Sequence, residues 1–197
     1  MRRKELGVVR QPRRTRAPKR HGSAGTFSRG STEWQTKLGH LLTNASTHNV
    51  VALVGVGHRL RCDDYVGSFI AKRLSKSAYS KFRKGIETYD AESDVESIIA
   101  KLARLKPKHV VFIDACELGA KPGEVRLVSV IETNYAFFTT HGLPLRLLAE
   151  RLLPDSHVWV LAIQTKNSDF GETLSPQVRS TALAIEDFMK RIIMGGA

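Results

Sequence analysis

Three polar loops in the sequence carry side chains that could together bind a divalent metal ion. Asp63 and Asp64 lie in the loop after the apolar run of residues 50–54, Asp114 follows a second apolar run, and His141 lies in a third polar loop. Carboxylate oxygens and imidazole nitrogens are ligands that suit nickel, zinc or cadmium. The sequence therefore predicts a metal site, provided that these three loops meet in the fold.

Each of these residues also has a simpler interpretation. Asp63 and Asp64 could cap a following helix and compensate its dipole, which is worth up to about 1 kcal/mol for each carboxylate. Asp114 could cap the next turn, and a lone loop histidine such as His141 is more often structural than functional. Two adjacent aspartates are more than capping needs, and this favours the metal site.

Buried strands alternate with helices along the chain. Apolar runs predict strands at residues 50–54, 86–89, 109–113, 124–130 and 158–163, and helical periodicity predicts helices at residues 34–42, 64–81, 90–105, 143–153 and 175–193. This alternation is typical of a three-layer α/β/α sandwich with a mostly parallel five-stranded sheet, of the phosphorylase/hydrolase-like kind. We expect residues 124–130 to form one antiparallel edge strand. Ligands bind outside the carboxyl ends of such strands, so the polar loops lie where a site is expected.

A dinucleotide site is the first alternative, because Gly55-Val56-Gly57 follows a predicted strand. That fingerprint needs a third glycine where this chain has Leu60. Asp63 and Asp64 would also repel a pyrophosphate at the start of the next helix. Neither a Ser-His-Asp arrangement nor an HExxH helix is evident, so a generic peptidase with its own nucleophile is disfavoured as well.

The formal net charge of +12 is distributed unevenly. Residues 1–30 hold ten Lys and Arg side chains and one acid, which leaves only +3 for the rest of the chain. We expect residues 1–33 to be a basic, disordered extension and residues 34–197 to be one domain. Attachment of the extension to RNA or DNA is a weaker alternative, because no aromatic side chain is interleaved with its charges.

Apolar runs and cysteine content indicate the cellular compartment in which we expect the protein. No apolar run approaches the roughly 20 residues of a membrane-spanning helix, and the basic N-terminus has no apolar stretch of a secretory signal. Cys62 and Cys116 give no disulfide framework. We therefore expect a cytoplasmic protein with two free thiols.

Four blocks of sequence follow one another at characteristic spacing: residues 55–58 with 63–67, 111–115 with 121–126, 139–145, and 162–164. Together they resemble the NiFe-hydrogenase maturation endopeptidase family, most closely its hydrogenase 3 branch of the formate-hydrogenlyase type. The similarity covers roughly residues 50–193.

The resemblance implies an aspartic-type endopeptidase that activates a hydrogenase. It implies that Asp64, Asp114 and His141 are both the metal ligands and the catalytic residues. The metal would be nickel already held by the partner, a hydrogenase large-subunit precursor, from which the enzyme removes a C-terminal extension. No organic cofactor and no membrane partner are implied, and we expect a monomer.

The sequence departs from the family at His58, where asparagine is common. Imidazole could replace the amide as a hydrogen-bond partner, or it could become an extra metal ligand. Cys62 could be a soft ligand, although a passive thiol is favoured. Asp63 or Asp114 could accept the proton during cleavage.

Two alternatives from other functional classes stay open at this point. The first is a non-catalytic chaperone of the same fold that senses the loaded metal centre. The second is a nucleic-acid-binding protein that acts through its basic extension, for which binding should depend steeply on salt.

Overall fold

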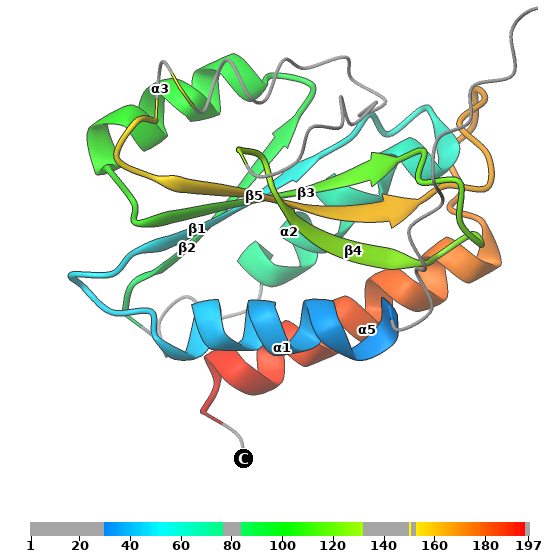
Figure 1. Cartoon of the computed structure of the whole chain (residues 1–197). Helices are drawn as coiled ribbons and strands as arrows, with labels where there is room; N and C mark the ends of the chain where they lie inside the picture. The colour runs from blue at the N-terminus through cyan, green and yellow to red at the C-terminus, as the bar shows by residue number, and fades with distance from the viewer. Residues whose placement is uncertain (1–29, 77–83, 132–149, 151–152, 196–197) are drawn as a thin grey trace, which may run out of the picture.

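A five-stranded sheet with helices on both faces forms the centre of the protein (Figure 1). The computed structural model describes residues 30–76, 84–131, 150 and 153–195. The strands are β1 Val51–Val56, β2 Ile86–Glu92, β3 His109–Cys116, β4 Val125–Ser129 and β5 His157–Gln164. The helices are α1 Gly30–Thr43, the 3₁₀ helix η1 Cys62–Tyr65, α2 Val66–Lys76, α3 Val95–Leu105 and α5 Pro176–Ile193.

The strand order is β2-β1-β3-β5-β4. Strands β2, β1, β3 and β5 are parallel, whereas β4 runs antiparallel to β5 at the edge of the sheet. The predicted three-layer architecture and the antiparallel edge strand are therefore confirmed. Every residue of β1 is buried, because helices cover both of its faces.

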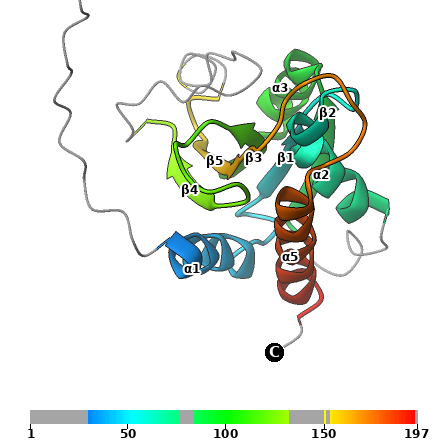
Figure 2. The ribbon, with the colours of Figure 1, turned by 90° about the vertical axis from the view of Figure 1, so that its right-hand side faces the viewer.

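Two hydrophobic cores lie on the two faces of the sheet. Figure 2 shows α3 on one side of the sheet and α1 and α5 on the other. Helices α1, α2 and α5 pack on one face, where Leu53 and Ile113 point, and α3 packs on the other, where Val54 and Phe112 point. Successive strand residues alternate between the faces. Helix α5 contributes a stripe at steps of three and four residues: Val178, Ala182, Ile185, Met189 and Ile193.

Several element boundaries differ from those predicted. Strand β3 continues to Cys116, so Asp114 lies inside the strand and not in the loop after it. The helix predicted from residue 64 begins with η1, and α2 proper starts at Val66. Strand β2 continues to Glu92, and α3 begins only after Asp94, whose side chain accepts the Ser97 amide hydrogen. Pairing with β1 as far as Val56 accounts for the longer β2.

Some predictions fall on residues that the structure does not describe. These are the helix at residues 143–153 (apart from residues 150 and 153), the end of the helix predicted to residue 81, His141 and nearly all of the basic extension. Helix α1 begins at Gly30, ahead of the predicted domain boundary at residue 34. Among the described helices, none has the length and apolar character needed to cross a bilayer.

Glycine allows α2 to start in contact with the ends of two strands. A Cβ atom on Gly67 would lie 1.9 Å from the carbonyl oxygen of Ile113 and 2.4 Å from that of Val56. Both distances are far below van der Waals contact, so only glycine fits here. The first turn of α2, directly after η1, is thereby held against the carboxyl ends of β1 and β3.

At the amino ends of the parallel strands, on the opposite side of the sheet from the start of α2, His109 and His157 begin β3 and β5. The two residues pair in register. Their rings stack with centroids 5.3 Å apart. Burial lowers the pKa of His109, and the neighbouring His157 and Lys108 lower it further. The folded protein therefore favours the neutral form of this imidazole.

We predict that Gly67→Ala destabilises the protein by more than about 3 kcal/mol, because the added methyl group overlaps two backbone carbonyls. Gly39 in α1 is the matched control, since a Cβ there would meet Phe188 at an ordinary 3.6 Å. Gly39→Ala should be neutral or stabilise by up to about 1 kcal/mol through helix propensity. Urea unfolding measures both, and equal stabilities of the two variants would contradict this packing.

The stability of the folded protein should depend on pH through His109. Unfolded chains bind a proton on histidine near pH 6.5, whereas folded His109 takes one only at lower pH. The free energy of unfolding should therefore fall as the pH drops below about 6.5, and it should fall less in His109→Gln. Urea unfolding over this pH range tests the slope. An unchanged slope in His109→Gln would refute the assignment.

Candidate active site at the carboxyl edge of the sheet

Asp64 lies in η1 and is completely buried. Its Oδ2 atom accepts the backbone N–H of His58 at 3.0 Å, just beyond the end of β1. Gly57 makes this turn possible, because its φ is +144° and a Cβ atom there would lie 2.0 Å from the carbonyl oxygen of Asp64. The turn after β1 is thus folded tightly over the helix that carries Asp64.

Asp114 lies near the carboxyl end of β3 and is 1% exposed. Ile113 pairs with Gly55, so Asp114 is level with the end of β1. Its Oδ1 atom accepts the N–H of Ala115 at 2.8 Å. Burial raises the pKa of the Cys116 thiol, and the nearby charge of Asp114 raises it further, which indicates that the two side chains share one environment.

Asp64 follows β1, and Asp114 lies near the end of the neighbouring strand β3. Both residues therefore lie at the carboxyl ends of the parallel strands. The helix turn that follows Asp64 touches the carbonyl of Ile113, the residue before Asp114. His141 lies outside the described residues. The chain before it is described up to residue 131, and the chain after it is described at residue 150 and from residue 153. Val130 and Leu153 both pack in the core on the α3 face. Within the described part of the chain, no group of three or more His, Cys, Asp or Glu side chains could hold a metal ion.

Asp63 is also buried, but its surroundings differ from those of Asp64. Its Oδ2 atom accepts the amide hydrogens of Lys166 and Asn167 at 2.9 and 3.0 Å. Ser175 donates its amide hydrogen to Oδ1 at 2.6 Å and its hydroxyl hydrogen to Oδ2 at 2.9 Å. Four donors therefore engage this carboxylate, which argues against a role for Asp63 as the proton acceptor.

Further backbone bonds hold the β5–α5 loop, residues 165–174, against the segment before Asp64. The amide of Gly171 donates to Leu60, and its carbonyl accepts the amide of Cys62. Cys62 itself has φ of 45°, an uncommon conformation for a residue other than glycine. The Asn167 side-chain amide lies 3.9 Å from the Cys62 sulfur, so this buried thiol contacts the loop.

Gln164, at the end of β5, organises the loop after β3. Its Oε1 atom accepts the amide hydrogens of Leu118 and Ala120 at 2.7 and 3.1 Å. Its Nε2 group donates to Glu117 and to the carbonyl of Thr165. The side chain is 3% exposed and its amide is fully used, so its role here is structural.

A cluster of charged side chains connects α2 to β2 near the carboxyl ends of the strands. Lys72 of α2 pairs with Asp90 at 3.3 Å and with Glu92, both in β2. Burial alone would lower the pKa of Lys72, but the two carboxylates raise it above its usual range. The carbonyl of Glu92 accepts the amide hydrogen of Gly57. The cluster therefore supports the turn that carries His58.

His58 is exposed, and its Nδ1 atom accepts the amide hydrogen of Leu60 at 3.2 Å. It thus acts as a hydrogen-bond partner within its own loop, one of the two roles expected from the sequence.

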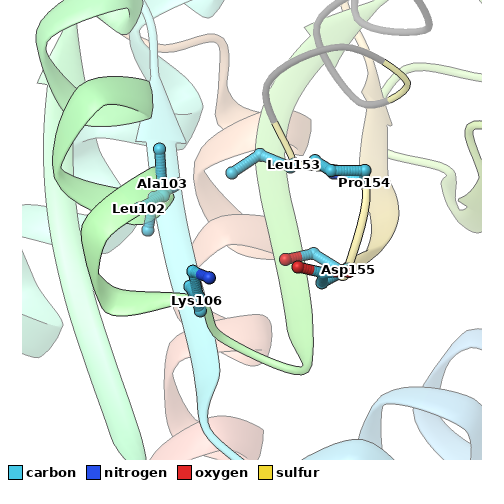
Figure 3. Close-up of a pocket in the computed structure, with 7 residues that line it drawn as sticks. Leu102, Ala103, Lys106, Leu153, Pro154 and Asp155 are labelled. Atoms are coloured by element: carbon cyan, nitrogen blue, oxygen red, sulfur yellow. The ribbon is translucent and has the colours of Figure 1, made fainter.

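A pocket of about 290 Å³ lies elsewhere, at the amino edge (Figure 3). Lys106, the residue that caps the C-terminus of α3, lines one side, and Leu153 to Asp155, which precede β5, line the facing side. These elements lie at the opposite ends of the strands from Asp64 and Asp114. The pocket is therefore separate from the candidate site.

The family model for hydrogenase maturation proteases, HycI, matches residues 70–194. The chain belongs to the hydrogenase maturation protease family. This membership confirms the assignment made from the sequence, and it identifies the protein as a protease of hydrogenase maturation rather than a non-catalytic chaperone. The matched segment includes Asp114 and His141 and begins after Asp64.

Individual hydrogenase maturation proteases agree with this assignment. The Hydrogenase 3 maturation protease of Escherichia coli K12 is 26% identical over 142 residues, which are 71% of this chain and 86% of that protein. The crystal structure of the HycI protease of Thermococcus kodakarensis has a TM-score of 0.67 at 25% identity, and the match covers 80% of this chain and 98% of that one. The solution structure of the endopeptidase HycI of Escherichia coli, at 23% identity, shares the fold with a TM-score of 0.61 over 72% of this chain and 89% of that one.

Sequence reasoning missed the structural roles of Asp63 and Gln164 in this hydrogenase maturation protease. Ser175 before Pro176 is typical of a helix cap, yet its hydroxyl makes no capping bond and donates to Asp63 instead. No local signal predicts that contact, since the two residues lie 112 positions apart.

We predict that Asp63→Ala destabilises the protein by about 3–5 kcal/mol, because four donors lose the buried carboxylate that accepts from them. Asp169 is the matched control, an exposed aspartate in the same loop. Asp169→Ala should change the free energy of unfolding by no more than about 0.5 kcal/mol. Urea unfolding of both variants measures this difference, and equal effects would show that Asp63 does not hold the loop.

Proposed function

We propose that this protease is a nickel-dependent endopeptidase that removes the C-terminal extension of a NiFe-hydrogenase large-subunit precursor. Asp64, Asp114 and His141 would hold nickel that the precursor already carries. The enzyme would act in the cytoplasm as a monomer and without an organic cofactor.

The observation that carries the proposal is the burial of two carboxylates at the ends of neighbouring strands. Asp64 and Asp114 are 0% and 1% exposed and reach the same edge of the sheet. Burying an ionised carboxylate costs several kcal/mol unless a cation or hydrogen bonds compensate it. Asp64 accepts the amide hydrogen of His58, and Asp114 accepts that of Ala115. A divalent metal ion presented by the substrate would add a cation to these partners, and the oxygen and nitrogen donors suit nickel.

The same arrangement supports separate catalytic roles for the metal ion and for one of the carboxylates. Nickel held at this edge would polarise the scissile carbonyl or activate a water molecule. Of the two carboxylates that could accept the proton, Asp63 is engaged by four donors. Asp114 is therefore the better candidate for the general base.

We predict that Asp64→Asn, Asp114→Asn and His141→Ala each reduce cleavage of the nickel-loaded precursor at least about a hundredfold, because metal stabilisation of the transition state is worth several kcal/mol. The length of the large subunit, followed by mass spectrometry, measures cleavage. Circular dichroism should show that the three variants remain folded. Wild-type cleavage by any one of them would remove that residue from the site.

Glu186 offers a control for loss of a buried carboxylate. It is 1% exposed and pairs with Arg73 and Lys190 between α2 and α5. Burial alone would raise the pKa of Glu186, but these two cations lower it. Glu186→Gln should lower the melting temperature and leave cleavage at 25 °C unchanged. Loss of cleavage in this variant would mean that removing a buried charge away from the site also abolishes cleavage, so the other losses would not locate the site.

A further inference from the structure

Phe170 stands out among the described residues because its side chain is 84% exposed. The other large apolar side chains exposed in the described segments are Leu105, Ile131 and Met194. Leu105 ends α3 before β3 begins, Ile131 follows the antiparallel β4, and Met194 follows α5. Of these four, Phe170 alone lies in a loop that follows the carboxyl end of a parallel strand.

The backbone on both sides of Phe170 is held firmly. Asn167 donates its amide hydrogen to Asp63 and accepts the amide hydrogen of Asp63 through its carbonyl. Gly171 makes two backbone bonds, to Leu60 and Cys62. The exposure of Phe170 therefore does not result from a loosely attached loop.

These contacts also place Phe170 next to the candidate active site. The loop bonds to residues 60–63, which directly precede Asp64 in the chain. Figure 1 shows the loop in orange beside the edge toward which the parallel strands point. Arg61, Lys166 and Glu172, which lie in this loop or in the segment bonded to it, are exposed as well, so the region presents an aromatic side chain together with polar ones. Protein interfaces commonly have this arrangement, with an apolar centre and a polar rim.

We propose that the β5–α5 loop is a docking surface for the hydrogenase precursor and that Phe170 is its anchor. Aromatic side chains are frequent anchors in interfaces, and a fixed backbone lowers the entropy lost on binding. The precursor would cover Phe170 with an apolar surface next to its scissile segment. This inference rests on the proposed function for the identity of the partner.

The test compares Phe170→Ala with Met194→Ala, which removes an exposed apolar side chain far from the site. Binding is measured by interferometry on nickel-loaded precursor that is immobilised through its N-terminus, and cleavage is measured separately as KM and kcat. Phe170→Ala should weaken binding and raise KM by about tenfold, with kcat and melting temperature unchanged. Phe170→Tyr should restore most of the affinity, and Met194→Ala should match the wild type.

Equal affinity and KM in Phe170→Ala and the wild type would overturn the proposal. A loss of kcat with unchanged KM would also overturn it, because Phe170 would then act on the chemistry. A wild-type dimer that dissociates in Phe170→Ala, seen by sedimentation, would make a second copy of the chain the occupant and refute docking of the precursor. Phe170-dependent binding without cleavage would refute the proposed function and would support the docking surface.

Discussion

The hydrogen bonds of the buried Asp63 carboxylate are the interaction on which the carboxyl edge of this protease depends. They tie η1 to the β5–α5 loop, whose Lys166 lies 103 residues further along the chain than Asp63. A buried carboxylate is costly unless donors compensate it, and separating the two segments would break all four of these hydrogen bonds. The loop, the first turn of α5 and the start of α2 are therefore held as one unit.

That rigid unit places the neighbouring Asp64 at the end of β1. Gly67 then brings the same helix turn against the carbonyl before Asp114, so two carboxylates approach one edge with almost no exposure to solvent. Charges in such surroundings interact far more strongly than in water. In our account, this concentration of negative charge favours a precursor that presents a divalent metal ion over one that does not.

The fold could be predicted from the sequence more completely than the site. Buried strands have continuous apolar runs, and the alternating pattern of β4 identifies it as an edge strand. Asp63 and Asp64, by contrast, are identical side chains in one short helix. What separates their roles is the set of partners in the 166–175 segment, which only the tertiary structure supplies. Asp114 was placed at the correct edge but in a loop, because strand periodicity does not show where pairing with β5 ends.

The most direct test of the central claim is incubation of the wild-type enzyme with the large-subunit precursor in nickel-loaded and nickel-free forms. Mass spectrometry would follow the mass of the large subunit and of any released C-terminal peptide. We expect release from the nickel-loaded precursor and none from the nickel-free one. Equal cleavage of both forms would contradict this expectation, because the edge formed by Asp64 and Asp114 would then have no part in recognising the metal.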